Sequence, residues 1–297
     1  ITGSGKTTTL NTLLQTLPDK SSKKIYAYED PTEYRMRGVS QVSVPTKDKS
    51  RDGGGSEDVD ASPFTERMKN FLRLDPDVGM LGEIRDKPSA SILQQAVESG
   101  HQIFTTVHAT SAIGIVKRLV SPQIGLTRDV LGGDDFVTAF VYQRLIPRNC
   151  PHCSVPGIGV LSNEKLAILE TNFRIDPYKI KCASELGCSK CQISGFTPAK
   201  SEDGPSRLGI KGQTVIAEII IPDDQFKEYI FKGEDLAAKR YWRSKRTSDY
   251  FEPDMEGKTA YEHGLYKVST GEIDLRFLED AALGIEFYQT NEPSGGF

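Results

Sequence analysis

The sequence predicts an α/β fold, in which helices flank a parallel β-sheet. Three observations favour this class of fold. The chain begins with a glycine-containing stretch, and a helical pattern follows it at 10–17. Short apolar runs typical of buried strands come next, and helical patterns lie between or after them: strands at 25–28, 78–81 and 103–107, helices at 64–73 and 89–98. Strands that alternate with helices in this way are typical of a parallel sheet.

The opening residues, ITGSGKTT, match the end of a phosphate-binding loop of the form G-x-x-x-x-G-K-[ST]. In such a loop the glycines let backbone N–H groups point at phosphate oxygens. The lysine reaches the β- and γ-phosphates of a nucleotide, and the hydroxyl that follows it ligates Mg²⁺. The residues that we predict to bind ATP are Gly3, Ser4, Gly5, Lys6, Thr7 and Thr8, and Thr7 is also the predicted Mg²⁺ ligand.

The loop's leading glycine would precede Ile1, and no strand precedes the loop in this chain. We therefore expect a chain that is cut at its N-terminus and that hydrolyses ATP poorly by itself. Leucines at helical spacing follow the loop up to Pro18, as expected for a helix whose N-terminus faces the phosphates. The alternative is a glycine turn before an ordinary helix, and the Gly-Lys-Thr triplet argues against it.

Polar side chains follow the three predicted strands at the points where they end: Glu29, Glu83 and His108. Because ligands bind at the carboxyl ends of parallel strands, we expect these groups to converge near Lys6. Glu83 is the predicted water-activating carboxylate, and His108 is predicted to sense the γ-phosphate. Gly82 occupies the place of the usual Mg²⁺-holding aspartate, which leaves Glu29 as the candidate for the metal's shell. The alternative for each of these three residues is a structural role, in which its side chain caps the end of a strand or is exposed to solvent there.

Composition narrows the class of protein further. The 297 residues carry a formal net charge of -4, which argues against a generic nucleic-acid binder. Hydrophobic residues make up 37% of the chain, and no stretch approaches the roughly 18 apolar residues of a membrane span. ATP chemistry and paired cysteines both suit the cytoplasm.

Four of the five cysteines form two C-x-x-C pairs, Cys150 with Cys153 and Cys188 with Cys191. Two such pairs supply four thiolates, enough for a tetrahedral structural Zn²⁺. The gap between the pairs is longer than in a compact zinc ribbon. Cys182 is an alternative to Cys188, although its spacing to Cys191 is wider. Unliganded, reduced cysteines are the other alternative.

Two further segments stand out by composition. The polar, glycine-rich stretch at 47–62 is predicted to be a surface insertion. The basic stretch at 239–246, KRYWRSKR, is predicted to be a solvated helix face with Tyr241 and Trp242 packed beneath it. Contact with anionic lipid headgroups is the alternative.

These motifs together resemble the secretion ATPases that drive type II secretion and type IV pilus assembly. TGSGKTTTL resembles the family's Walker A loop, YAYEDPTEY its Asp box, LRLDPDVGMLGEIRD its atypical Walker B segment and ESGHQIFTTVHA its His box. VYQRLIPRNCPHC, GCSKC and GQTVIAEIII resemble the assembly-type branch of the family, which carries a widely separated tetracysteine motif.

The resemblance implies a RecA-like P-loop NTPase domain with a zinc-binding insertion and a helical C-terminal region. It implies three parts: an ATPase core at 1–149, a tetracysteine subdomain at 150–195, and a mostly helical region at 196–297. It also implies a bacterial homo-hexamer that lies in the cytoplasm at the inner membrane and acts on a membrane platform protein. No direct contact with nucleic acid is expected.

The resemblance assigns roles to single residues as well. Glu83 matches the catalytic glutamate, and the four paired cysteines match the zinc ligands. Before DPD the family usually has two arginines four residues apart, where this chain has Lys69 and Arg73. Arg73 is therefore added to the predicted catalytic residues. Lys69 departs from the pattern, because a lysine cannot make the planar fork contacts of an arginine.

Two other functions remain open from the sequence. One is a conjugative-transfer or pilus-retraction motor of the same superfamily, and the tetracysteine motif argues against the retraction motors. The other is a nucleotide-gated interaction subunit that binds ATP without turnover. The intact Glu83 argues against it, because binding alone does not require that carboxylate.

Overall fold

The computed structural model describes residues 3–43, 70–191 and 208–289 of the chain. The chain forms two compact units, which we describe separately. The first unit contains residues 1–138 and 222–235, and the second contains 139–221 and 236–297. The three parts expected from the sequence divide the chain at other places, and that division stays a prediction.

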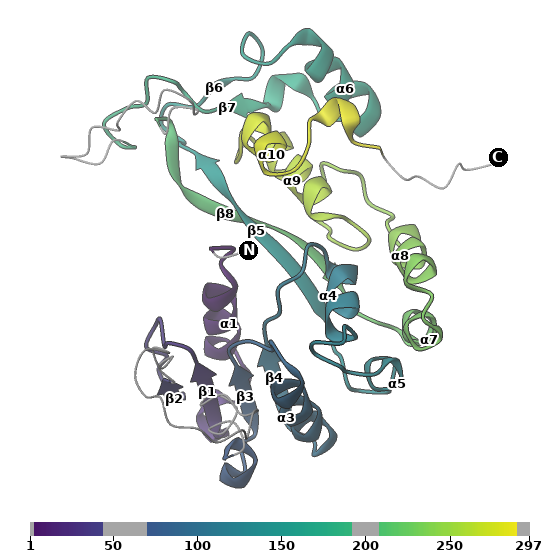
Figure 1. Cartoon of the computed structure of the whole chain (residues 1–297). Helices are drawn as coiled ribbons and strands as arrows, with labels where there is room; N and C mark the ends of the chain where they lie inside the picture. Colours follow the sequence, from purple (N-terminus) through teal and green to yellow (C-terminus); the bar gives the residue numbers. More distant parts are fainter. Residues whose placement is uncertain (1–2, 44–69, 192–207, 290–297) are drawn as a thin grey trace, which may run out of the picture. The chain divides into compact units, whose positions relative to one another are not determined.

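A four-stranded parallel sheet is the centre of the first unit (Figure 1). Its strands lie in the order β2-β1-β3-β4, and their bounds are β1 Ile25–Glu29, β2 Ser40–Ser43, β3 Val78–Leu81 and β4 Gln102–Thr105. The α/β fold class with a parallel sheet is thus confirmed, with the three predicted strands in place. Strand β2 was not predicted, because its four residues, SQVS, contain no apolar run.

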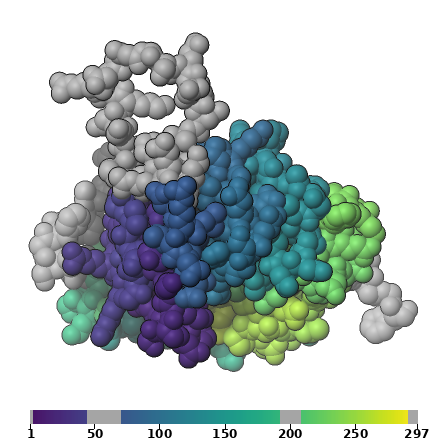
Figure 2. All heavy atoms as spheres, turned by 90° about the horizontal axis from the view of Figure 1, so that it is seen from below, coloured from purple at the N-terminus to yellow at the C-terminus, as the bar shows by residue number. Residues whose placement is uncertain are grey.

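Helices complete the first unit, whose purple and blue residues form one contiguous body in Figure 2. Leu10 and Leu14 of the first helix pack with Ile25, Ala27 and Met80 of the strands, so this helix covers one face of the sheet. The helices of the unit are α1 Lys6–Gln15, α3 Lys87–Glu98, α4 Ala112–Leu119, α5 Arg128–Leu131 and α7 Asp224–Lys232, with 3-10 turns at Lys20–Ser22 and Phe71–Leu74.

Two glycines of the Walker B segment are required by close packing in the sheet. A Cβ on Gly79 would lie 2.4 Å from the ring of Phe71, which packs against β3. A Cβ on Gly82 would lie 3.0 Å from the carbonyl oxygen of Tyr28 and 3.4 Å from the Cα of Glu29. Gly82 also donates its N–H to that carbonyl at 2.8 Å. The end of β3 therefore lies directly against the end of β1, where a larger residue does not fit.

The second unit is built on a long antiparallel pair, β5 Phe140–Asn149 and β8 Ile210–Ile220, which run side by side in Figure 1. A short hairpin joins β6 Val155–Pro156 to β7 Lys181–Cys182. Helices complete the unit: α6 Asn163–Phe173, α8 Asp235–Ser244, α9 Ala260–Ser269 and α10 Leu275–Ala281, with 3-10 turns at Pro177–Lys179 and Ile285–Phe287.

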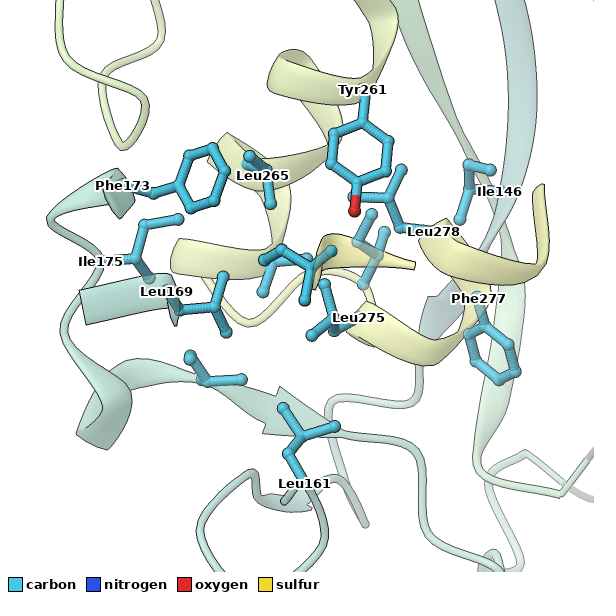
Figure 3. Close-up of a cluster of buried hydrophobic side chains, with 14 of the residues drawn as sticks. Ile146, Leu161, Leu169, Phe173, Ile175, Tyr261, Leu265, Leu275, Phe277 and Leu278 are labelled. Atoms are coloured by element: carbon cyan, nitrogen blue, oxygen red, sulfur yellow. The ribbon is translucent and has the colours of Figure 1, made fainter. Parts of the chain in front are cut away.

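The core of the second unit lies between α6, α9, α10 and the β5–β8 pair. Side chains from these elements point toward one another in Figure 3, with Leu169, Leu265, Leu275 and Leu278 fully buried. Thr259 and Glu262 form a capping box at the start of α9, which satisfies backbone donors that the helix itself cannot pair. The predicted helical C-terminal part is confirmed by α8, α9 and α10.

Some predictions from the sequence differ from the structure. The helix predicted at 64–73 lies largely outside the described residues, and its visible end, Phe71–Leu74, is a 3-10 turn. The first helix ends at Gln15 rather than at Pro18. The segment 196–297 contains the strand β8 besides its helices. The insertion predicted at 47–62 lies outside the described residues.

The described helices include none that combines the length and the apolar character needed to span a membrane.

Candidate nucleotide-binding site and cysteine cluster

The loop at the start of the chain has the backbone geometry that a phosphate requires. Gly3 and Gly5 have φ angles of 78° and 81°, in the left-handed region that favours glycine. Helix α1 begins directly after Gly5, at Lys6. Consecutive backbone N–H groups and the positive end of the helix dipole therefore coincide at this point, which fits a bound phosphate. Ser4 is buried in the loop, Lys6 and Thr7 are half-buried, and Thr8 is exposed.

Glu83 lies two residues beyond the end of β3 and is held by two cationic or potentially cationic side chains. Arg85 donates from Nε and Nη2 to Oε2 of Glu83, at 2.9 and 2.8 Å. His108 lies on the other carboxylate oxygen, with its Nε2 at 3.1 Å from Oε1. The structure thus brings Glu83 and His108 together, as the strand-end rule predicts. The Glu83 side chain is only 17% exposed, so its two partners largely define its orientation.

Arg85 connects this pair to the end of β1. Its Nη1 lies 3.8 Å from the Asp30 carboxylate. Asp86, the next residue, caps helix α3 through a capping box with Ser89, and this fixes the backbone that carries Arg85. The ion pair with Glu83 raises the pKa of Arg85, so the guanidinium stays charged.

The groups around His108 act on the pKa of its imidazole. Partial burial lowers the pKa of His108, and Glu83 opposes that shift. The positive charges of Lys6 and Arg85 lower the pKa of His108 further. A neutral imidazole is therefore favoured, and its Nε2–H can donate to the Glu83 carboxylate. The charges of Glu83 and Lys6 thus both act on the pKa of His108, in opposite directions.

Glu29, the last residue of β1, is 4% exposed. Burial raises the pKa of its carboxyl group, the nearby Glu33 raises it further, and a hydrogen bond from Gln41 lowers it. That bond runs from Nε2 of Gln41 to Oε1 of Glu29, at 2.9 Å. Because Glu29 lies against Gly82, the structure brings it to the same strand ends as Glu83.

Arg73 lies apart from these groups. It is exposed in the 3-10 turn Phe71–Leu74, which precedes β3. The turn therefore lies at the edge of the sheet where β3 begins, whereas Glu83 lies at the edge where β3 ends. The structure does not bring Arg73 to the other predicted site residues within this unit.

Three residues at this site were not predicted from the sequence: Asp30, Arg85 and Gln41. The first two sit next to predicted residues in the motifs YEDP and GEIRD, so the sequence did contain a signal for them. The sequence contained no such signal for Gln41, because β2, the strand that carries it, was itself not predicted.

The four paired cysteines come together in the second unit, and their Sγ atoms all lie within 4.8 Å of one another. The Sγ atoms of Cys150 and Cys188 are 3.9 Å apart, and those of Cys153 and Cys191 are 3.8 Å apart. Zn–S bonds of about 2.3 Å in a tetrahedron put neighbouring sulfurs about 3.8 Å apart. The cluster therefore has the ligand type, number and spacing of a structural zinc site.

Cys182 is excluded from this cluster. It is buried in β7, and burial raises the pKa of its thiol to about 12. Cys188, in contrast, accepts a hydrogen bond from the backbone of Lys190, which lowers the pKa of its thiol to about 7. Position decides the ligand set, because the four Sγ atoms that come together are those of the two C-x-x-C pairs.

The basic segment in α8 is only partly a solvated face. Trp242 is buried and donates its Nε1–H to the carbonyl of Ile219 at 3.1 Å. Arg243 points inward to a buried ion pair with Glu262. Lys239 and Arg240 are exposed. The predicted packing of Trp242 beneath the face is thus confirmed.

A left-handed glycine loop at the head of a helix, beside parallel strands that end in carboxylates, defines a nucleotide-binding protein of the P-loop class. The profile of the family described as "Type II/IV secretion system protein" matches residues 1–262. This match covers most of the chain, and the chain belongs to that family.

Curated relatives agree with this membership. The chain is 31% identical over 268 residues to type II secretion system protein E of Aeromonas hydrophila, covering 89% of this chain and 46% of the relative. It is 31% identical over 240 residues to type II secretion system ATPase E of Vibrio cholerae, covering 80% of this chain and 41% of the relative. The chain therefore spans less than half the length of these relatives.

Solved structures are similar in fold. The Legionella pneumophila ATPase DotB matches with a TM-score of 0.55 and 19% identity, over 94% of this chain and 57% of that chain. The pilus retraction motor PilT matches with a TM-score of 0.54 and 20% identity, over 98% and 60% of the two chains. At these identities the likeness concerns the fold alone.

Proposed function

We propose that this protein hydrolyses ATP to ADP and phosphate, and that the reaction powers assembly of a pilus or pseudopilus in type II secretion or type IV pilus biogenesis. The family membership supports the secretion context. The relative in Vibrio cholerae is described as a type II secretion system ATPase. The tetracysteine cluster supports the assembly-type branch over the retraction motors.

The observation that carries the proposal is the position of Glu83. Its carboxylate lies at the ends of the parallel strands, is largely buried and is held by Arg85 and His108. In this proposal Glu83 orients and deprotonates the attacking water, and the neutral imidazole of His108 donates to the carboxylate to fix its direction. Lys6 provides positive charge at the γ-phosphate, and the backbone of Gly3–Gly5 holds the β-phosphate.

The Thr7 hydroxyl and the Glu29 carboxylate would hold Mg²⁺, which would neutralise charge on the phosphates. Glu29 suits this role because it is a carboxylate at the strand ends, with Gly82 in the place of the usual aspartate. Arg73 stays a proposed catalytic residue on the family resemblance alone.

We propose that Zn²⁺ binds the four thiolates of Cys150, Cys153, Cys188 and Cys191 in a purely structural role. Four protein ligands leave no open coordination position for catalysis. By family resemblance, the proposed assembly is a homo-hexamer in the bacterial cytoplasm that acts on an inner-membrane platform protein. Anionic lipid contact at Lys239 and Arg240 belongs to the same proposal, with no direct contact to nucleic acid.

The first experiment measures steady-state ATP hydrolysis with Mg²⁺ by the full-length protein and by its Glu83→Gln variant. The expected result is a loss of about 10²-fold or more in kcat with unchanged ATP binding, because glutamine keeps the size of the side chain but cannot accept a proton. A Glu98→Gln variant, altered on the exposed face of α3, is the matched control and should keep full activity.

Retention of turnover by Glu83→Gln would contradict the role of Glu83. If both forms bind ATP and neither hydrolyses it, even with anionic vesicles and a platform protein added, a nucleotide-gated subunit becomes the better description.

A further inference from the structure

Gln41 occupies a junction between the strand β2, the strand end at Glu29 and the loop that joins β1 to β2. Its Nε2 donates to Oε1 of Glu29 at 2.9 Å and to the carbonyl oxygen of Tyr34 at 2.6 Å. Its Oε1 accepts from the backbone N–H of Met36 at 2.8 Å. One side-chain amide thus connects the buried carboxylate to two backbone positions of the loop.

Only an amide of this length can make these three bonds together. Two donors on nitrogen and an acceptor on oxygen are both needed, and among side chains the amides of Asn and Gln supply both. A glutamate at this position would keep the acceptor for Met36 but would lose the donors to Glu29 and Tyr34. A leucine would keep much of the volume and lose all three bonds.

Gln41 and the backbone N–H of Glu33 both donate hydrogen bonds to the Glu29 carboxylate. The side chain is almost completely buried, and unpaired buried carboxylates are costly. The register of the sheet brings the two residues together, because β2 is parallel to β1 and Gln41 is the register partner of Ala27, two residues before Glu29. Side chains two residues apart on a strand share one face, which places Gln41 beside Glu29.

We propose that Gln41 is a positioning residue: it fixes the Glu29 carboxylate, and with it the loop at 30–39, in the orientation in which Glu29 meets the metal ion of a bound nucleotide. This inference rests on the proposed place of Glu29 in the Mg²⁺ shell. The residues that orient metal-binding groups typically influence metal affinity by 10–100-fold.

A purely structural role for Gln41 is the alternative, and the chain offers a matched control for it. Gln15 of α1 donates from Nε2 to the carbonyl of Arg37 in the same loop, at 3.3 Å, and its Oε1 accepts from Lys20 at 2.8 Å. Gln15 therefore supports the loop through the same chemistry, and its side-chain amide bonds to Arg37 and Lys20. Gln15→Leu removes loop support alone, whereas Gln41→Leu removes loop support and the bond to Glu29.

The test measures binding of a non-hydrolysable ATP analogue to the protein by calorimetry while Mn²⁺ is varied, so that no turnover is needed. We expect Gln41→Leu and Gln41→Met to raise the half-saturating Mn²⁺ concentration by about 10-fold or more, because both lose the donor to Glu29 and add no metal ligand. Binding of the analogue without metal should stay unchanged. Gln15→Leu should leave the Mn²⁺ dependence at the wild-type value.

Equal Mn²⁺ dependence of the Gln41 and Gln15 variants would overturn the inference and leave the proposed function intact. If Gln41→Leu does not fold, Gln41→Met carries the test, because methionine keeps the unbranched shape of the side chain and loses the bond to Glu29. Analogue binding by the wild type that shows no dependence on Mn²⁺ would overturn both the proposed metal site and this inference.

Discussion

Two groups of paired charges, one in each unit of the molecule, differ in their exposure to solvent. In the first unit, the charges around Glu83 are partly open to solvent, with Arg85 61% and His108 49% exposed. In the second, Arg243 is 9% exposed and its partner Glu262 is completely buried. Partly exposed groups can exchange partners when a ligand arrives, whereas buried charges must stay paired. This difference fits the proposed catalytic role of the charges around Glu83. The pair of Arg243 and Glu262 fits a role in stabilising the fold.

The largest expected effect concerns the cysteine cluster in the second unit. Zinc binding contributes about 10–16 kcal/mol to the folding of zinc-finger peptides, so its removal should lower stability more than any single side-chain change. We expect Cys150→Ser combined with Cys188→Ser to abolish zinc content and to lower the melting temperature strongly. Elemental analysis and thermal unfolding, with and without a chelator, measure this.

Cys182→Ser is the matched control for that experiment, because Cys182 is buried but lies outside the cluster. It should keep the full zinc content. Loss of zinc in Cys182→Ser, or its retention in the double variant, would show that another ligand set holds the metal.

The next largest effect is the loss of unfolding free energy when an arginine is removed, and it is compared between one arginine of each unit. Arg243→Ala leaves the Glu262 carboxylate buried without its partner, which should cost about 3–5 kcal/mol of unfolding free energy. Arg85→Ala removes a largely exposed partner of Glu83 and should cost less than about 1 kcal/mol. Denaturant unfolding of both variants measures the contrast. Similar losses of stability in the two variants would contradict the comparison.

A smaller effect than that expected for Arg243→Ala is a pH dependence of the free energy of unfolding, through a histidine of the second unit. His263 is buried, accepts a hydrogen bond at Nδ1 from the Ala217 N–H at 3.0 Å, and has its pKa lowered to about 4 by burial and by the charges of Lys267 and Lys258, against Glu272. Between that value and the ordinary pKa of 6.5, the unfolded chain binds more protons than the folded one. Stability should therefore fall as pH drops through this window.

The expected loss approaches about 3 kcal/mol at the lower end of the window, from about 1.4 kcal/mol for each pH unit. In His263→Asn, where the amide oxygen can replace Nδ1 as acceptor, the difference between the free energies of unfolding at pH 6.5 and pH 4 should shrink by that amount. An unchanged pH dependence in this variant would assign the effect to other groups.

The sequence by itself determined the elements whose signals are local. The glycine-lysine-threonine triplet and the leucine spacing predicted the loop and α1, because both depend on neighbours in the chain. The apolar runs before Glu29, Glu83 and His108 predicted three strands, and the parallel-strand rule then predicted that their ends meet. The C-x-x-C spacing predicted two ligand pairs. In each case a few consecutive residues carry enough information.

Only the tertiary structure decided the contacts between distant segments. The choice of Cys188 over Cys182 depends on where the chain places their thiols. Gly82 is favoured because the end of β1 lies close to its Cα. The proposed role of Gln41 depends on the register of β2, a strand too short and too polar to predict. Arg85 and Arg243 both pair with a glutamate, yet Arg85 is 61% exposed and Arg243 is 9% exposed, beside a completely buried carboxylate. Side-chain partners from segments far apart in sequence are selected by packing, which no local pattern records.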